Sequence, residues 1–182
     1  MIVNTIPQEQ PEYPRALVQW LGNNTPTHLS YIGNIEILKQ PLLGLFSSVK
    51  CPANLIIKAH DLAHKLGEAG TPVISGFHSP VEKEMLSVLL RGQGPVVLCP
   101  ARGLGKIRLS KIQQQALEEN RLLLISLFTD GVMRSREEYA LQRNLFVAAL
   151  AKEVVVVYSA PSGNVEKLCI QLNTWKKKVT YI

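Results

Sequence analysis

The segment SGFHSPVE, residues 75–82, places a glycine, a histidine and a carboxylate in the turn between an expected strand and an expected helix. Gly76 permits a positive φ or close approach of the backbone to a neighbouring group. His78 can donate to a phosphate or a base, act as an acid–base group, or be an ordinary solvated turn histidine. Ser79 and Glu82 have the spacing of a capping box with proline at the first helical position. The turn is therefore expected first to change the direction of the chain and to cap the following helix. Its second expected role is to line an anion pocket, and we do not expect it to be a reaction centre.

Motifs typical of catalysis and of nucleotide binding are missing from the sequence. It contains no G-x-S-x-G, no G-K-[ST], no H-E-x-x-H and no G-x-G-x-x-G. The segment RGLGK, residues 102–106, is basic and glycine-rich and follows an expected strand, but its spacing fits neither a P-loop nor a dinucleotide fingerprint. Arg102 and Lys106 are therefore candidates for anion binding, and we expect neither a catalytic residue nor a cofactor.

The spacing of cysteine and histidine argues against a metal site. Cys51, Cys99 and Cys169 are scattered and lack C-x-x-C spacing, as expected of buried reduced thiols. His60 and His64 lie four residues apart in an expected helix and form half a site at most, because no third ligand is near in the sequence. We expect no bound metal.

Length and composition indicate one α/β domain. The chain has 182 residues, of which 46% are hydrophobic and 19% charged, with a formal net charge of +6. The basic balance favours an anionic partner, since counterion release drives most non-specific binding to nucleic acid. No apolar run is long enough to span a bilayer, and the first residues lack a secretory pattern. We therefore expect a cytoplasmic protein with no membrane partner.

Apolar runs alternate with amphipathic segments from residue 42 onward. Strands are expected at 42–48, 72–75, 95–99, 121–126, 153–159 and in the closing segment 176–182, with helices at 53–69, 79–91, 110–119, 136–151 and 163–175. Gly70 has the place of a C′ glycine, and capping-box spacing recurs at Ser110–Gln113 and Ser135–Glu138. Strands that alternate with helices indicate a doubly wound α/β fold, a Rossmann-like three-layer domain with a mostly parallel sheet.

The first part of the chain has a different pattern. Residues 11–22 carry a short helical stripe, and residues 27–34 alternate like an edge strand or an extended arm. Residues 1–41 are therefore expected to form a short helix and strand extension packed on the core, which occupies residues 42–182.

The turns that follow the strands hold most of the chemically useful side chains. Ligands of doubly wound sheets bind beyond the carboxyl ends of the strands, near the point where the strand order reverses. The expected turns at that edge are 47–54, 75–82, 99–110, 126–138 and 159–166. They contain serine hydroxyls and a set of cationic side chains, namely Lys50, His78, Arg102, Lys106, Arg108, Arg134 and Arg136. A site for an anion is expected along this edge.

Three segments in order resemble one family. Residues 12–38, EYPRALVQWLGNNTPTHLSYIGNIEIL, resemble its YPxxL and GN stretches. Residues 42–76 resemble its first strand, turn and helix and its Ser-Gly strand end, and residues 142–163, QRNLFVAALAKEVVVVYSAPSG, resemble its Arg-Asn helix, valine-rich strand and final Ser-Gly turn. The sequence is thus similar to the Rossmann-like core of DNA-processing protein A, the DprA/Smf recombination mediator of the SLOG superfamily.

The resemblance implies a function and a set of binding residues. The family binds single-stranded DNA, loads a RecA-type recombinase in recombination and natural transformation, and forms a homodimer through this core. Carried over by position, its basic pocket corresponds to Ser47, Ser48, Lys50, Ser75, Gly76, Phe77, His78, Arg143, Asn144, Ser162 and Gly163.

Two departures distinguish this chain from the family. Ser47-Ser48-Val49 stands where the family has Gly-Ser-Arg, and Phe77 and His78 stand where it has an Ala-Arg-Gly-Ile-Asp stretch. No winged-helix segment follows the core, so a divergent core-only relative is expected.

Three functions remain open at the level of sequence. The first is binding of single-stranded DNA in DNA processing, with phosphates held by amides and cations and a base stacked on Phe77. The second is a sensor for a nucleotide or a nucleotide-derived ligand, read by His78, Arg102 and Ser162. The third is a nucleoside-monophosphate phosphoribohydrolase, for which Glu166 in APSGNVEKL is the candidate carboxylate.

Overall fold

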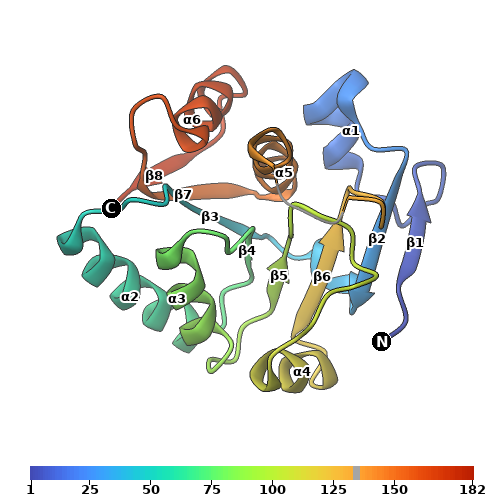
Figure 1. Ribbon diagram of the computed structural model, residues 1–182, viewed down its shortest axis with the longest axis horizontal. Coiled ribbons are helices and arrows are strands. Elements are labelled where there is room, and N and C mark those ends of the chain that lie inside the picture. Colours follow the sequence, from blue (N-terminus) through green and yellow to red (C-terminus); the bar gives the residue numbers. More distant parts are fainter. Residues whose placement is uncertain (133–135) are drawn as a thin grey trace.

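The computed structural model describes residues 1–132 and 136–182, and Figure 1 shows their arrangement. Eight strands form one sheet: β1 Asn4–Pro7, β2 His28–Gly33, β3 Leu43–Ser47, β4 Val73–Ser75, β5 Val96–Leu98, β6 Leu122–Ser126, β7 Glu153–Tyr158 and β8 Val179–Tyr181. The α-helices are α1 Arg15–Leu21, α2 Ala53–Glu68, α3 Pro80–Leu89, α4 Lys111–Glu118, α5 Glu137–Leu150 and α6 Asn164–Thr174. Two 3₁₀ turns, Gly22–Asn24 and Ile35–Lys39, flank β2.

The strand order places a switch point in the middle of the sheet. The order is β1-β2-β6-β5-β4-β3-β7-β8, and β3 to β8 run parallel where they pair. The chain winds from β3 outward to β6 and then returns to place β7 on the other side of β3. The reversal therefore lies between β3 and β7, where ligands of doubly wound sheets bind. The expected α/β, Rossmann-like fold is confirmed.

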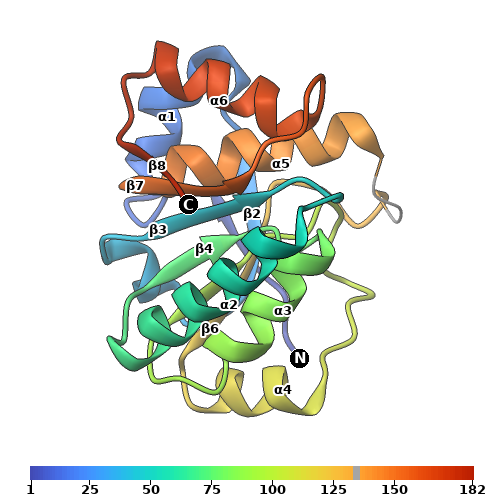
Figure 2. The ribbon, with the colours of Figure 1, turned by 90° about the vertical axis from the view of Figure 1, so that its left-hand side faces the viewer.

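Each face of the sheet carries its own apolar core. Successive residues of β7 point to opposite faces, so that Val154 and Val156 belong to one core and Val155 and Val157 to the other. Helices α1, α5 and α6 cover the first face, and α2, α3 and α4 cover the second (Figure 2). Because helices shield both faces, the central strands are continuous apolar runs rather than alternating ones.

The N-terminal residues extend the sheet as well as packing on it. β1 pairs antiparallel with β2, and β2 pairs antiparallel with β6. The expected edge strand at 27–34 is therefore an inner strand, because β1, which the sequence analysis did not predict, takes the edge. In α1, which packs against α5, Leu17 is fully buried. The buried Tyr13, just before α1, donates its hydroxyl to the carbonyl of Pro26 (2.6 Å), and its burial raises its pKa to about 12.

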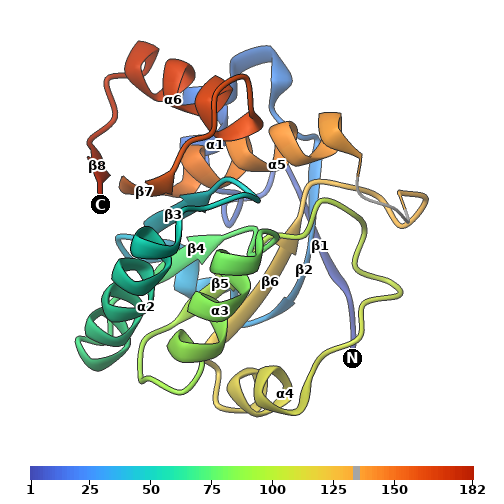
Figure 3. The same ribbon diagram turned by 60° about the vertical axis from the view of Figure 1, so that its left-hand side comes forward.

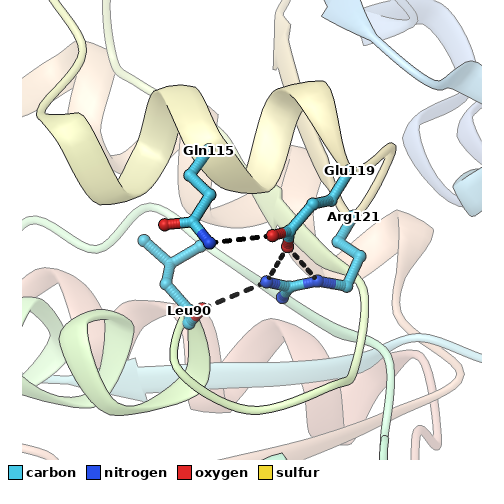
Figure 4. A network of polar contacts seen from close by, with 4 residues as sticks. All are labelled: Leu90, Gln115, Glu119 and Arg121. Carbon is cyan, nitrogen blue, oxygen red and sulfur yellow. Dashed lines mark hydrogen bonds and ion pairs between the residues drawn. The ribbon is translucent and has the colours of Figure 1, made fainter.

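A polar network joins the ends of α3 and α4 (Figure 4). Arg121 donates through Nε (2.9 Å) and Nη2 (2.5 Å) to the carboxylate of Glu119 and through Nη2 to the carbonyl of Leu90 (3.3 Å). Gln115 donates to the other carboxylate oxygen (2.9 Å). The hydrogen bonds from Gln115 and Arg121 lower the pKa of Glu119. The network fixes the start of β6 against the end of α3.

Several local signals behave as the sequence predicts. Ser79 and Ser110 each form a complete capping box, and Gly70 ends α2 with φ of +64°. The third expected box begins at Ser135, which lies outside the described residues, as does Arg134. Over the described part of the chain, none of the helices has the length and apolar character needed to cross a bilayer.

Candidate functional site

A cavity of ≈ 300 Å³ opens at the carboxyl edge of the sheet, over the switch point between β3 and β7. Figure 3 shows these two strands between α5 and α6 on one side and α2 and α3 on the other. The turns after β3, β4 and β7 form its walls together with the first turns of α3 and α6 and the first two turns of α5. Its lining residues are Ser47, Ser48, Val49, Lys50, His78, Ser79, Glu82, Ala140, Arg143, Asn144, Ala160, Gly163, Asn164 and Val165. Several side chains that the sequence assigned to an anion site thus meet in one recess.

Arg143 is the buried cation of this cavity, and only 4% of it is exposed. Its Nε donates to Oδ1 of Asn144 (2.8 Å), and its Nη1 donates to the carbonyl of Cys99 (3.2 Å). Nη2 has no hydrogen-bond partner among the described residues, although the side chain lines the cavity. Burial lowers the pKa of Arg143 and Glu82 opposes the shift, but a guanidinium keeps its proton in any case. One charged donor is therefore left for a ligand.

Gly76 provides the space for that guanidinium. A Cβ atom at this position would lie 1.4 Å from Nη1 of Arg143 and 1.9 Å from its Cζ. The sequence suggested two reasons for a glycine here, a positive φ angle or the close approach of another group. The φ angle at Gly76 is not positive, so the close approach of Arg143 is the reason that the structure supports.

The carboxylate of Glu82 already occupies the amides of two turns. It accepts from the amides of Ser47 (2.8 Å) and His78 (2.8 Å) and from the amide of Ser79 (3.1 Å). The capping role expected for Ser79 and Glu82 is confirmed, and Glu82 further joins the turn after β4 to the turn after β3. These amides are satisfied internally, so an incoming anion must find its donors elsewhere.

The start of α6 supplies such donors. Its N-cap is Gly163, whose lack of a side chain leaves the first amides of the helix without a side-chain acceptor. Gly163, Asn164 and Val165 line the cavity, so these amides lie at the same recess as the guanidinium of Arg143. Helix N-termini of this kind attract phosphate groups. The Oδ1 atom of Asn164 is buried and has no hydrogen-bond partner among the described residues, while its Nδ2 donates to the carbonyl of Glu137 (3.2 Å).

Lys50 and His78 lie at the mouth of the cavity. Both are exposed, and both line the recess. Loss of water from the part of its ring that packs against neighbours, together with the charge of Arg143, lowers the pKa of His78, while Glu82 raises it and Lys83 lowers it. His78 is therefore neutral at pH 7 and can donate one hydrogen bond or, on acidification, gain a charge.

Three of the expected binding residues have structural roles outside the lining. Ser75 is fully buried and donates its hydroxyl to the carbonyl of Leu45 (2.7 Å). Phe77 is 4% exposed and packs in the core beside α2 and α3, so its ring is not available for stacking on a base as we expected. Ser162, with φ of +60°, donates its amide to Glu166 (2.7 Å).

Arg102 and Lys106 lie at the same edge but outside the cavity. They belong to the loop after β5, whose position is fixed by contacts with the loop after β6. Ser126 donates to the carbonyl of Arg102 (2.7 Å), and Asp130 accepts from the amide of Gly105 (2.8 Å). These contacts fix the backbone of the loop that carries the two cations beside β5.

Residues of α5 and α6 other than the Arg143–Asn144 pair also line the cavity, and the sequence did not indicate them. Ala140 and Val165 are small or apolar residues with no chemical signal of their own. Asn164 follows the Ser-Gly turn and could have been found as the first residue of a helix without a capping side chain. Tyr139, half-buried at the start of α5, packs against Phe128 with the two rings tilted and their centroids 5.3 Å apart.

Metal ligands do not gather in the part of the chain that the structure describes. It contains no group of three histidine, cysteine or carboxylate side chains placed to hold an ion. His60 and His64 lie beside each other on α2 with ring centroids 4.6 Å apart. Cys99 is fully buried, which raises its pKa strongly, whereas Cys51 and Cys169 are half-buried.

Solved structures share this fold. DNA processing protein A (DprA) from Streptococcus pneumoniae superposes with a TM-score of 0.81 at 18% identity over 98% of this chain. The chain spans 62% of that protein's length. DNA processing protein A from Helicobacter pylori, a structure described for its unique single-stranded DNA binding mode, has a TM-score of 0.79 at 17% identity and is matched over 80% of its length by 98% of this chain.

A more distant likeness joins the chain to molybdenum cofactor carriers. The carrier protein from Chlamydomonas reinhardtii has a TM-score of 0.53 at 16% identity, with 78% of this chain and 76% of that one covered. No curated protein matches the sequence. A family model described as DNA recombination-mediator protein A matches residues 4–174. The chain therefore belongs to the DNA recombination-mediator protein A family.

Proposed function

We propose that the protein binds single-stranded DNA in DNA processing and recombination and holds the phosphates at the carboxyl edge of its sheet. The observation that carries the proposal is the meeting of the unpaired Nη2 of Arg143 and the uncapped start of α6 in one cavity. Both groups donate hydrogen bonds, and both favour negative charge. A phosphate offers acceptor oxygens to each of them at once.

The electrostatic balance of the cavity supports an anion rather than a cation. Lys50 and Arg143 are positive, and His78 adds a charge on acidification. Glu82 carries the one carboxylate among the described lining residues, and its oxygens accept hydrogen bonds from three backbone amides. These oxygens are therefore not free to pair with Lys50 or Arg143 in place of a ligand. A phosphate therefore meets free positive groups, while the carboxylate oxygens of Glu82 keep their charge but are held by the backbone amides of Ser47, His78 and Ser79.

A strand longer than one nucleotide would continue along the same edge. The turn after β5, with Arg102 and Lys106, follows next to the turn after β4 in the order of the sheet. Cations at spaced positions suit a flexible single strand, whose backbone contacts position the ligand without reading sequence. With Phe77 buried, stacking falls to Tyr139, which is half-buried near the cavity residues of α5.

A nucleotide-derived ligand is the second candidate. The cavity volume of ≈ 300 Å³ is at the lower end for small-molecule sites, and the buried, unpaired Oδ1 of Asn164 can accept from one amino or hydroxyl group. Such a site needs the cavity alone, whereas a DNA strand also needs the cations beside β5. This difference separates the two candidates in experiment.

Phosphoribohydrolase activity has weaker support. Its candidate carboxylate, Glu166, accepts a hydrogen bond from the amide of Ser162 in the first turn of α6, as a capping carboxylate does. Binding without catalysis is the proposal. The RecA-type partner, the homodimer, the role in natural transformation and the cytoplasmic location implied by the resemblance stay predictions.

The proposal is tested by fluorescence anisotropy with a labelled single-stranded oligonucleotide at two salt concentrations, with duplex DNA and mononucleotides as competitors. Lys50→Glu and Arg102→Glu remove one cation at the cavity and one beside β5, and Lys58→Glu on the exposed face of α2 is the matched control. Binding of a single strand should weaken in the first two variants and show a salt slope lower by about 0.7 for each phosphate that the protein no longer neutralises. The control should keep the slope of the parent protein.

Each outcome distinguishes the candidates. A strand affinity reduced by both Lys50→Glu and Arg102→Glu supports DNA binding along the edge. Mononucleotide binding that Lys50→Glu weakens and Arg102→Glu leaves unchanged, with no binding of the strand, replaces the proposal by the nucleotide sensor. Equal affinity of all three variants for the strand contradicts the proposed surface.

A further inference from the structure

A second basic concavity lies at the opposite edge of the sheet. Its volume is ≈ 340 Å³, and it is lined by the end of α5, the residues before β3, β7 and β8, and one face of α1. Four lysines line it, namely Lys152, Lys176, Lys177 and Lys178, and none of its described lining residues is acidic. We refer to these four lysines, with Trp20 of α1, as the lysine basin.

Topology separates the lysine basin from the first cavity. The basin lies where β3 and β7 begin and α5 ends, whereas the first cavity lies where β3 and β7 end and α5 begins. The two ends of α5 are at opposite sides of the molecule in Figure 2. A group bound in one recess therefore does not touch the other.

One lysine of the basin has a structural role. Nζ of Lys177 donates to the carbonyls of Ala148 (2.7 Å), Ala149 (3.3 Å) and Ala151 at the end of α5, and it lies 4.8 Å from the ring centroid of Trp20. These contacts satisfy orphan carbonyls and complement the helix dipole. These contacts give Lys177 a structural role, but they do not account for Lys152, Lys176 and Lys178, the other three lysines of the basin.

Lys176 occupies a backbone position that disfavours a lysine. Its φ of +53° is left-handed, and the amides of Lys176 and Lys177 bond back to Asn173 (3.0 Å) and Leu172 (3.0 Å) as in a Schellman motif. Glycine or asparagine is the usual residue there, because a Cβ atom strains the left-handed region. In α2 the equivalent residue is Gly70, whose φ is +64°. The exposed ammonium group of Lys176 thus stands at a position where a lysine backbone is more strained than a glycine backbone would be.

The charge of the basin exceeds what its helix ends require. Lys178 pairs with Glu153 (2.5 Å), and the ends of α5 and α6 each contribute about half a negative charge. Lys152 and Lys176 are exposed and have no ion-pair partner among the described residues. Two free positive charges therefore flank a recess whose wall includes an indole ring.

We propose that the lysine basin is a second binding site for the phosphate backbone of a single-stranded nucleic acid, independent of the first cavity. Lysines spaced around an aromatic wall match a phosphate chain whose bases are apolar on their faces. An acidic peptide would use the lysines but would gain nothing from Trp20, which favours the nucleic acid.

The tryptophans make the site directly observable. Trp20 and Trp175 are the only tryptophans of the sequence and lie together, with ring centroids 5.5 Å apart, whereas the lining of the first cavity contains none. Intrinsic tryptophan fluorescence therefore reports the basin. The probe is an unlabelled single-stranded oligonucleotide, compared with inorganic phosphate, a mononucleotide and a polyglutamate peptide.

The test variant is Lys152→Gln/Lys176→Gly, and its control is Lys58→Gln/Lys65→Gln on the exposed face of α2. The oligonucleotide should change the tryptophan emission of the parent and of the control alike. In the test variant its apparent affinity should fall roughly tenfold at low salt, with the salt slope lower by about 1.4 because two phosphates are no longer neutralised. The same variant should melt at a temperature at least as high as the parent, because glycine relieves the strain at Lys176.

The first-cavity variants separate this proposal from the proposed function. Lys50→Glu/Arg102→Glu should leave the oligonucleotide-induced emission change intact, whether or not it alters anisotropy. The proposal is overturned if the emission change disappears in that variant, if Lys152→Gln/Lys176→Gly binds like its control, or if polyglutamate produces the change and the oligonucleotide does not. Saturation by phosphate or a mononucleotide at the affinity of the oligonucleotide would likewise contradict a backbone site.

Discussion

Substitution of Gly76 by alanine should destabilise the protein by displacing the guanidinium of Arg143. The new Cβ atom would lie 1.4, 1.9 and 2.6 Å from Nη1, Cζ and Nε of Arg143, so the guanidinium must leave its place. Its hydrogen bonds to Asn144 (2.8 Å) and to the carbonyl of Cys99 (3.2 Å) are then broken. A hydrogen bond from a charged group contributes about 1.5–3 kcal/mol. Because the expelled group regains water, we take the lower limit for both and expect a loss of about 3 kcal/mol.

A double-mutant cycle isolates this cause. In an Arg143→Ala background the obstacle is gone and the φ angle at position 76 accepts alanine, so Gly76→Ala should cost less than about 0.5 kcal/mol. Urea unfolding followed by circular dichroism measures both costs. With a slope of about 2 kcal/mol per molar urea, the midpoint should fall by roughly 1.5 M in the parent background.

The result that refutes the reasoning is a cost of Gly76→Ala that is the same in both backgrounds, or one below about 1 kcal/mol in the parent. Either outcome would mean that displacement of the Arg143 guanidinium does not set the cost of the substitution. In the expected case Gly76→Ala also weakens single-stranded DNA binding, because the free donor of Arg143 leaves the cavity.

Three further predictions concern residues around and beneath the site. Glu82→Gln should lower the free energy of unfolding by about 2 kcal/mol in urea, because one carboxylate serves three amides and a carboxamide has only one acceptor oxygen. The pKa of His78 lies below its ordinary value and a bound phosphate raises it, so DNA affinity should increase roughly fivefold as the pH falls through the range in which His78 gains its proton. His78→Gln should abolish that increase in anisotropy. The raised pKa of Tyr13 means that the folded state keeps a proton that the unfolded state releases, so the free energy of unfolding should fall as the pH rises from 10 to about 12. In thermal melts, Tyr13→Phe should lack that pH dependence and should be less stable by about 1 kcal/mol at neutral pH, because its hydrogen bond to Pro26 is lost.

Local signals in the sequence were sufficient for most of the fold. Capping boxes at Ser79 and Ser110 and the left-handed glycine at Gly70 depend on residues close in sequence, and each forms as expected. β1 was not predicted because four residues, NTIP, carry no periodic signal and become a strand only by pairing with β2. The inner position of β2 has the same cause, since partners in a sheet are set by tertiary packing.

The candidate site was predictable only in part for the same reason. Because ligands of doubly wound sheets bind beyond the carboxyl ends of the strands, Lys50, His78 and Gly163 were expected at one edge of the sheet. The structure places all three in the lining of the cavity. The burial of Phe77 could not be predicted, because Phe77 has a φ of +45°, a conformation that non-glycine residues seldom adopt, and most of its core partners lie far away in the sequence. The fit of Arg143 over Gly76 joins residues from α5 and the turn after β4, and no local pattern encodes it.

The most direct test of the central claim is a crystal structure of the protein with a short single-stranded oligonucleotide. We expect a phosphate in the cavity over the switch point, with an oxygen about 3 Å from Nη2 of Arg143 and another at the same distance from an amide at the start of α6, Asn164 or Val165. An oligonucleotide bound with no phosphate within hydrogen-bond distance of Arg143 or of these amides would contradict the claim.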